Sequence, residues 1–366
     1  MSDEQNKAAV DQSSPLLDVQ GLSVSFGNSG DGDGGRLIAS DRVSMSVYAG
    51  QTLAVVGESG SGKSVSAMSV LRLIPTPPGS YDAGRIVWRG GREAVERDLL
   101  TLSEKAMRGV RGREIAMIFQ EPMTSLNPVY TIGEQITEAV LLHQDVTGAE
   151  AVKIAERALR DVGIAEPVGR LKEYPHQLSG GMRQRVMIAM ALACEPELLL
   201  ADEPTTALDV TIQAQILELL RKLQVSRGMA MMLITHDLGV VAENADTVAV
   251  MFAGRVVEFT DVHTLFERPL HPYTRGLLGS MPVLGQKVDR LGTVDDNATI
   301  PADFPSGYTV AEHDASAAGT GAYGGEGSLL HEVEPGHWVL CTAEGEGKPT
   351  PARLSGLRGA AVKTAV

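Results

Sequence analysis

The sequence predicts an α/β fold with a mostly parallel sheet flanked by helices, and three observations carry that prediction. An apolar strand at residues 52–56 runs into a glycine-rich turn and then into a helical pattern that reaches residue 73. Strand-like and helix-like segments alternate again between residues 179 and 235. One of these segments, at residues 198–202, is a short apolar run that ends in a carboxylate. Alternation of this kind is typical of parallel strands joined by helices.

The other elements follow from local patterns. Two antiparallel strands are expected near the N-terminus, joined by a loop at residues 27–35 whose glycines and aspartates have turn chemistry. Apolar residues recur at helical spacing from residue 131 to residue 162, so this stretch is expected to be helical. The full set of further expected elements is strands at residues 17–26, 42–47, 85–88, 114–119, 198–202 and 230–235, and helices at 179–194 and 212–223.

These elements group into three parts. Residues 1–15 form a polar tail that we expect to be disordered, and residues 16–270 form the main domain. A helical insert at about residues 121–178 interrupts the alternation of strands and helices in that domain. Residues 271–366 form a small, irregular extension that is partly of low complexity.

Composition excludes several classes of protein. The chain has 366 residues and a formal net charge of −14, and no strong basic run offsets it, so nucleic acid is disfavoured as the main partner. Cys194 and Cys341 are the two cysteines, which argues for a reducing compartment and against a disulfide framework. The N-terminus lacks the apolar core of a signal peptide, and no apolar run approaches the roughly 18 residues that a membrane span needs. We therefore expect a soluble, cytoplasmic protein, or one that docks on a membrane through another protein.

Residues 57–64 read GESGSGKS and fit the phosphate-loop pattern G-x-x-x-x-G-K-[ST] in full. The glycines let backbone N–H groups surround phosphate oxygens, and the N-terminus of the following helix adds positive potential. In this pattern Lys63 reaches the β- and γ-phosphates and the Ser64 hydroxyl binds Mg²⁺. A purely structural turn is the alternative, but the complete match between a strand and a helix favours binding of a nucleoside triphosphate.

Two carboxylates follow the apolar strand at residues 198–202. Asp202 and Glu203 would lie at the C-terminal edge of a buried strand, which is where ligands bind in α/β proteins. Asp202 is suited to hold magnesium, usually through water. Glu203 is suited to polarise an attacking water. The alternative is a strand that ends in two solvated acids, and the nearby phosphate loop favours the catalytic interpretation.

A second candidate phosphate contact lies at residues 178–182, which read LSGGM. Ser179 is a typical N-cap, and Gly180 and Gly181 would occupy the first helical turn. Each glycine there costs about 1 kcal/mol relative to alanine, so stability alone does not explain the pair. Close approach of backbone N–H groups to an anion does, and since the phosphate loop has its own nucleotide, this terminus would need another triphosphate. A flexible structural turn is the alternative.

Together these motifs resemble the ATP-binding cassette (ABC) ATPases, which have a P-loop NTPase fold, over about residues 16–270. The resemblance implies that two cassettes pair head to tail, with the 179–181 element of one closing over the γ-phosphate held by the other. It also implies that Gln120 lies near the magnesium and the attacking water, that Asp209 crosses the dimer interface and that His236 contacts the γ-phosphate. Phe26 matches the aromatic residue that stacks on adenine, although it could instead be a core residue.

The resemblance completes the list of candidate site residues. Catalytic roles are expected for Glu203, His236, Gln120 and Lys63, and magnesium contacts for Ser64, Gln120 and Asp202. The expected nucleotide-binding residues are Phe26, Gly57, Glu58, Ser59, Gly60, Ser61, Gly62, Lys63, Ser64, Val65, Ser179, Gly180, Gly181 and Asp209.

Three segments are similar to ATPase subunits of oligopeptide, dipeptide and nickel importers: residues 120–128 (QEPMTSLNP), 174–178 (YPHQL) and 271–275 (HPYTR). This resemblance implies an ATP-hydrolysing, Mg²⁺-dependent subunit of a peptide importer, peripheral on the cytoplasmic face of the inner membrane. Its partners would be a second ABC ATPase subunit, identical or paralogous, two permease subunits, and indirectly an extracytoplasmic solute-binding protein. An importer of nickel or another small solute is one alternative, and a nucleotide-gated regulatory module without turnover is another.

The C-terminal part departs from that subgroup, whose members often carry several cysteines proposed to hold an iron–sulfur cluster. Residues 334–338 (EPGHW) and Cys341 look like the end of such a segment, but the earlier cysteines are missing and residues 315–327 are small and glycine-rich. One thiolate cannot hold a cluster that needs four ligands, so we predict no cluster. His313, His331 and His337 lack clear ligand spacing and are expected on the surface.

Overall fold

The computed structural model describes residues 14–27, 36–91, 95–120, 125–206, 208–281, 293–310, 323–324 and 327–343. The expected tail up to residue 13, nearly all of the loop at 27–35 and most of the stretch at 315–327 lie outside these residues. The chain divides into two compact units, which are described separately. The first comprises Met1–Thr101 and Thr235–Val366, and the second comprises Leu102–Ile234.

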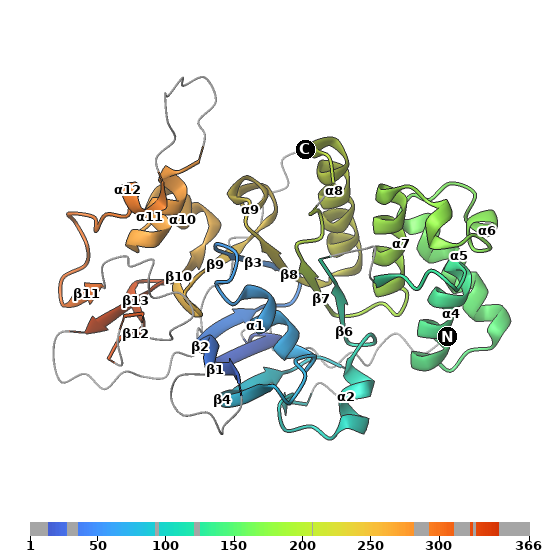
Figure 1. Ribbon diagram of the computed structural model, residues 1–366, viewed down its shortest axis with the longest axis horizontal. Coiled ribbons are helices and arrows are strands. Elements are labelled where there is room, and N and C mark those ends of the chain that lie inside the picture. Colours follow the sequence, from blue (N-terminus) through green and yellow to red (C-terminus); the bar gives the residue numbers. More distant parts are fainter. Residues whose placement is uncertain are drawn as a thin grey trace. The chain divides into compact units, whose positions relative to one another are not determined.

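An antiparallel sheet with the strand order β2-β1-β4-β5 opens the first unit (Figure 1). Its strands are β1 (Leu17–Phe26), β2 (Leu37–Val47), β4 (Gly79–Trp88) and β5 (Arg97–Asp98). The strands predicted at 42–47 and 85–88 are both longer than expected. Backbone pairing with β1 continues to Phe26, whose partners are Leu37 of β2 and Gly79 of β4, and this extends both neighbours to the end of β1.

The first unit contains a second set of strands. β3 (Thr52–Val56) lies parallel to β9 (Thr247–Phe252), and both are buried along their whole length. β10 (Arg255–Asp261) is antiparallel to β9 and to β13 (His337–Ala343), which also pairs with β11 (Tyr308–Val310) and β12 (Leu329–Glu334). The helices are α1 (Lys63–Val70), α9 (Leu238–Asn244), α10 (Val262–Glu267), α11 (Pro272–Gly279) and α12 (Val294–Asn297). Sequence patterns predicted only β3 and α1 among these.

The C-terminal strands correct one prediction. His337 was expected on the surface, but its side chain is 1% exposed and its Nε2 lies 2.6 Å from Oε1 of Glu258, which is fully buried on β10. A buried carboxylate needs hydrogen-bond partners, and a histidine on the neighbouring strand supplies one. His331 is partly buried on β12, and His313 lies outside the described residues.

The second unit is built on three parallel strands: β6 (Ile115–Ile118), β7 (Leu198–Asp202) and β8 (Ala230–Thr235). Figure 1 shows its helices α4, α5, α6 and α7 gathered together. The helices are α2 (Glu104–Val110), α4 (Ile132–His143), α5 (Gly148–Asp161), α6 (Pro167–Arg170), the 3₁₀ turn η2 (Pro175–Gln177), α7 (Gly180–Leu192) and α8 (Val210–Arg227). The predicted α/β fold with parallel strands and an antiparallel N-terminal sheet is confirmed.

The helical stretch predicted at residues 131–162 is two helices. Thr131 caps α4 and Thr147 caps α5, each in a reciprocal arrangement with the glutamate three residues later. A capping box begins a helix, so the second one separates α5 from α4. Their apolar faces join one core that includes Ile136, Leu159 and Ile188. Within the described residues, every helix is too short or too polar to cross a membrane.

Candidate functional site

The phosphate loop connects β3 to α1 in the first unit. Gly57 (φ +150°) and Gly62 (φ +97°) adopt positive φ values, which side chains disfavour. A Cβ atom on Gly57 would lie 2.1 Å from the carbonyl oxygen of Met251, and one on Gly62 would lie 2.3 Å from that of Ala39. Both positions therefore require glycine for conformation and for space, because the loop packs against backbone from β9 and β2.

Lys63 begins α1 and lies within the loop. Its side chain is 5% exposed, and its Nζ donates to the carbonyl oxygens of Gly57 and Glu58 at 2.7 Å each. The next residue, Ser64, is partly buried in the first turn of α1. In the described part of the chain no side chain caps this helix at Gly62, so its first N–H groups keep the geometry that suits an anion.

The loop glycines provide a matched test. Gly62→Ala is expected to weaken ATP binding at least about tenfold more than Gly60→Ala. Both residues have positive φ values, but only the methyl group at position 62 would collide with a backbone oxygen, since nothing lies within 4 Å of a Cβ on Gly60. Titration with a fluorescent ATP analogue measures both affinities, and circular dichroism checks that both variants fold. Equal losses would show that the contact with Ala39 does not shape the site.

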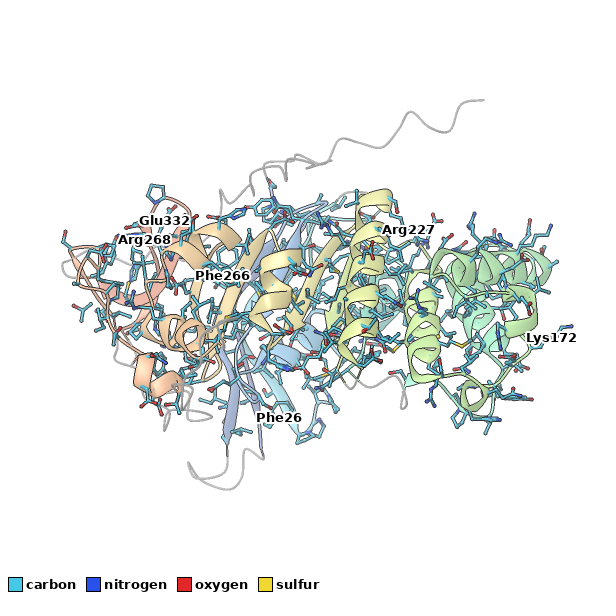
Figure 2. All side chains as sticks on the ribbon, turned by 90° about the horizontal axis from the view of Figure 1, so that it is seen from above. Phe26, Lys172, Arg227, Phe266, Arg268 and Glu332 are labelled. Carbon is cyan, nitrogen blue, oxygen red and sulfur yellow. The ribbon has the colours of Figure 1, made fainter. Side chains whose placement is uncertain are left out.

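Phe26 lies at the end of β1 (Figure 2), where it is partly buried. Its Cε1 atom lies 3.4 Å from the place that a Cβ on Gly79 would occupy, so the ring lies beside this glycine of the neighbouring strand. The ring keeps exposed surface at a strand end, which is compatible with stacking on a base.

Two predicted catalytic side chains meet in the second unit. Oε2 of Glu203 accepts hydrogen bonds from Nε2 of Gln120 at 2.9 Å and from Oγ1 of Thr206 at 2.8 Å. Glu203 follows directly on Asp202, which ends β7 and is 5% exposed. The Glu203 backbone has φ +44°, an uncommon value for a glutamate, and its N–H donates to Ile234 of β8 at 3.0 Å. Sequence reasoning missed Thr206, although a hydroxyl three residues after a candidate base was visible.

The glycine pair begins α7 as predicted. Ser179 is the N-cap and its hydroxyl accepts from the Met182 N–H at 3.4 Å. Gly180 is exposed, and nothing lies within 4 Å of a Cβ built there, whereas one on Gly181 would lie 3.2 Å from Ile212 of α8. Asp209 caps α8 by accepting from the Ile212 N–H at 3.0 Å. The starts of α7 and α8 therefore lie together in this unit.

A buried glutamine on α7 contacts the segment that follows Glu203. Gln184, which is 1% exposed, donates to the carbonyl oxygen of Pro204, the residue after Glu203.

His236 follows β8 and is exposed, and the next residue, Asp237, caps α9. The phosphate loop, Phe26 and His236 thus belong to the first unit, and Gln120, Asp202, Glu203, Ser179 and Asp209 to the second.

The C-terminal cysteine lies in a core. Cys341 is fully buried on β13, its Sγ donates to the carbonyl oxygen of Val339, and burial raises the pKa of the thiol to about 12. Among the residues that the structure describes, no group of three or more His, Cys, Asp or Glu side chains could hold a metal ion. The absence of a cluster stays a prediction.

Sequence reasoning also missed the contact of Tyr273 with the phosphate loop. Its hydroxyl accepts from the N–H of Glu58 at 3.0 Å. The HPYTR segment resembles a family motif, but no local pattern indicates that Tyr273 contacts Glu58, 215 positions away.

Comparison with protein families gives two matches. The model described as ABC transporter matches residues 40–206, and the model described as oligopeptide/dipeptide transporter, C-terminal region, matches residues 257–309. The chain is 54% identical over 269 residues to the oligopeptide transport ATP-binding protein of Bacillus subtilis, covering 74% of this chain and 72% of that protein. It is 51% identical over 280 residues to the dipeptide transport ATP-binding protein of the same organism, covering 76% and 81%.

Solved structures agree with these matches. A dimeric ATP-binding cassette in a post-hydrolysis state, bound to ADP and Pi, aligns with a TM-score of 0.57 at 25% identity and covers 68% of this chain and 99% of its own. A Clostridium perfringens protein from the ABC transporter complex cbiONQ aligns with the same TM-score at 26% identity, covering 70% and 92%.

Proposed function

The chain belongs to the ABC transporter family of ATP-binding proteins, and from that premise we propose that it is the ATP-hydrolysing subunit of an importer of di- and oligopeptides. The family supports the ATPase activity. The match of residues 257–309 to the C-terminal region of oligopeptide and dipeptide transporters supports the cargo, as do the two Bacillus subtilis relatives. We also propose the division into an ATPase domain at 16–270, with its helical insert at 121–178, and an extension at 271–366.

The observation that carries the hydrolytic assignment is the Glu203 carboxylate. It lies at the end of a buried strand and accepts hydrogen bonds from Gln120 and Thr206, which fix its orientation. An oriented carboxylate can polarise a water for attack on a phosphorus atom. In this proposal Glu203 activates the water, Gln120 positions it and His236 contacts the γ-phosphate.

The phosphate loop would hold the nucleotide. Lys63 would exchange its contacts with loop carbonyl oxygens for the β- and γ-phosphates, and Phe26 would stack on adenine. Mg²⁺ prefers oxygen ligands, and it commonly binds through one or two carboxylates together with phosphates. The oxygen ligands proposed here are the hydroxyl of Ser64, the carboxylate of Asp202 and the amide oxygen of Gln120. When bound, Mg²⁺ would neutralise charge on the phosphate oxygens.

ABC cassettes dimerise and act with membrane permeases, and we propose a head-to-tail dimer here. The exposed N-terminus of α7 supports it, because Gly180 leaves open space beside the backbone N–H groups that would face the partner's γ-phosphate. Asp209 would lie at the interface. The second cassette would be an identical chain or a paralogue, on the cytoplasmic face of the inner membrane, with two permeases and, indirectly, an extracytoplasmic binding protein.

Uptake assays test the cargo. In a strain that lacks this gene, we expect loss of uptake of labelled di- and oligopeptides, with recovery on expression of the wild-type chain and none with Glu203→Gln. Ni²⁺ uptake is measured in parallel. Normal peptide uptake with lost Ni²⁺ uptake would favour the nickel alternative, and unchanged uptake of all cargoes would remove the importer assignment.

A further inference from the structure

The N–H of Glu58 in the phosphate loop is held by a residue from the C-terminal region. It donates to the Tyr273 hydroxyl at 3.0 Å, and the Tyr273 side chain is fully buried at the start of α11. Burial raises the pKa of this hydroxyl, which keeps it neutral. Glu58 lies between Gly57 and the rest of the loop, so this bond fixes the point at which the loop leaves β3.

The ring of Tyr273 packs against a residue of β9. It lies against Phe252 of β9 with ring centroids 4.5 Å apart. The residue before Phe252 is Met251, whose carbonyl oxygen occupies the space that a Cβ on Gly57 would need. Tyr273 therefore packs on the β9 residue that follows the one in closest contact with Gly57.

The backbone of Tyr273 is fixed from the C-terminal strands. Nδ1 of His271 accepts from the Tyr273 N–H at 3.2 Å, and the N–H of His271 donates to Oε2 of Glu258 at 3.1 Å. Oε1 of Glu258 lies 2.6 Å from Nε2 of His337 on β13. All four of these side chains are at most 1% exposed. A chain of buried polar contacts thus runs from β13 to Glu58.

A second connection joins the same parts. The N–H of Gly254 donates to the carbonyl oxygen of Ser61 in the phosphate loop at 3.1 Å. Its neighbour Arg255, which is 2% exposed, donates to the carbonyl oxygens of Tyr323 at 2.7 Å and Ser328 at 2.6 Å. The phosphate loop is therefore held at both Glu58 and Ser61 by backbone and side chains that pack on the C-terminal region.

We propose that Tyr273 is a positioning residue for the nucleotide site, through which the C-terminal region sets the affinity of the phosphate loop for ATP. The inference rests on the proposed function, because the site that Tyr273 positions is the proposed ATP site. The inference assigns a part in nucleotide binding to the C-terminal region, meaning the chain from Arg255 onward. None of the residues of this region is among those proposed to contact ATP.

Tyr273→Phe tests the hydroxyl alone, and Tyr308→Phe is its control. Tyr308 lies on β11, and its hydroxyl donates to the carbonyl oxygen of Glu332 at 3.5 Å, outside the chain of contacts that reaches Glu58. We expect Tyr273→Phe to raise both the Kd for a fluorescent ATP analogue and the KM for ATP about tenfold, with kcat changed less than about twofold. Tyr308→Phe is expected to leave both constants unchanged.

Melting temperatures of both variants separate positioning from loss of stability. Equal Kd values for wild type and a folded Tyr273→Phe would overturn the inference while leaving the proposed function intact, and so would equal losses in both variants. A wild-type chain that binds no nucleotide would overturn the proposed function and this inference together.

The donor can also be removed from the loop. Proline at position 58 has no N–H, so Glu58→Pro is expected to raise the Kd for ATP by a similar factor, and this variant leaves the buried tyrosine in place. Adding Tyr273→Phe to Glu58→Pro should weaken binding no further if the two groups act through one bond. A further tenfold loss in the double variant would show that the hydroxyl acts elsewhere and would overturn the inference.

Discussion

Glu203→Gln is expected to lower steady-state ATP hydrolysis about 10²–10⁴-fold while ATP still binds. The amide oxygen of glutamine can accept the same hydrogen bonds from Gln120 and Thr206, so the local geometry should persist. A neutral amide lacks the basicity of a carboxylate, and polarisation of the attacking water should therefore be lost. Phosphate release measures turnover, and titration with a fluorescent ATP analogue measures binding.

Glu197→Gln is the matched control for this substitution. Glu197 is exposed, immediately precedes β7 and so lies at the other end of the strand that leads to Glu203. The same loss of one carboxylate should leave hydrolysis near the wild-type rate. If wild type and Glu203→Gln hydrolysed ATP equally, Glu203 would not be the base. If neither hydrolysed ATP under conditions where both bound it, a nucleotide-gated regulatory module would be favoured over an ATPase.

Local patterns in the sequence predicted much of the fold and the candidate site. The phosphate loop, the strand that ends at Asp202 and the helix that begins after Ser179 each combine an apolar run with a turn or cap in consecutive residues. Their local conformation depends on neighbours along the chain. For this reason the sequence predicted the elements. It did not predict the full length of β2 and β4, which pair with β1 as far as Phe26.

Contacts between distant segments could not be predicted in this way. The hydrogen bond from Thr206 to Glu203 is local, since the residues are three apart, and it is the exception among the missed contacts. His337 was expected on the surface because the histidines of this region lack clear ligand spacing, and its burial is explained by Glu258, 79 residues earlier. The bond from Glu58 to Tyr273 is of the same kind. Polar groups in a core are placed by partners that periodicity does not reveal.

Lys63→Ala is expected to have the opposite signature from Glu203→Gln, because it should remove ATP binding itself. Lys63 is 5% exposed and its ammonium donates to two loop carbonyl oxygens, so it already lies in the loop that would surround the phosphates. Its charge should form charge-assisted hydrogen bonds to phosphate, and we expect its removal to raise the Kd for ATP by about 100-fold or more.

Two further variants separate the causes of that loss. Lys63→Arg keeps the charge, but its planar guanidinium cannot reproduce the compact ammonium in a buried loop, so binding should remain impaired. Lys172→Ala removes an exposed lysine (Figure 2) and should leave the Kd unchanged, which excludes an effect of net charge alone.

Wild-type affinity in Lys63→Ala would remove the phosphate-loop assignment. Loss of binding in Lys63→Ala, together with retained binding and lost turnover in Glu203→Gln, would assign binding and hydrolysis to different residues.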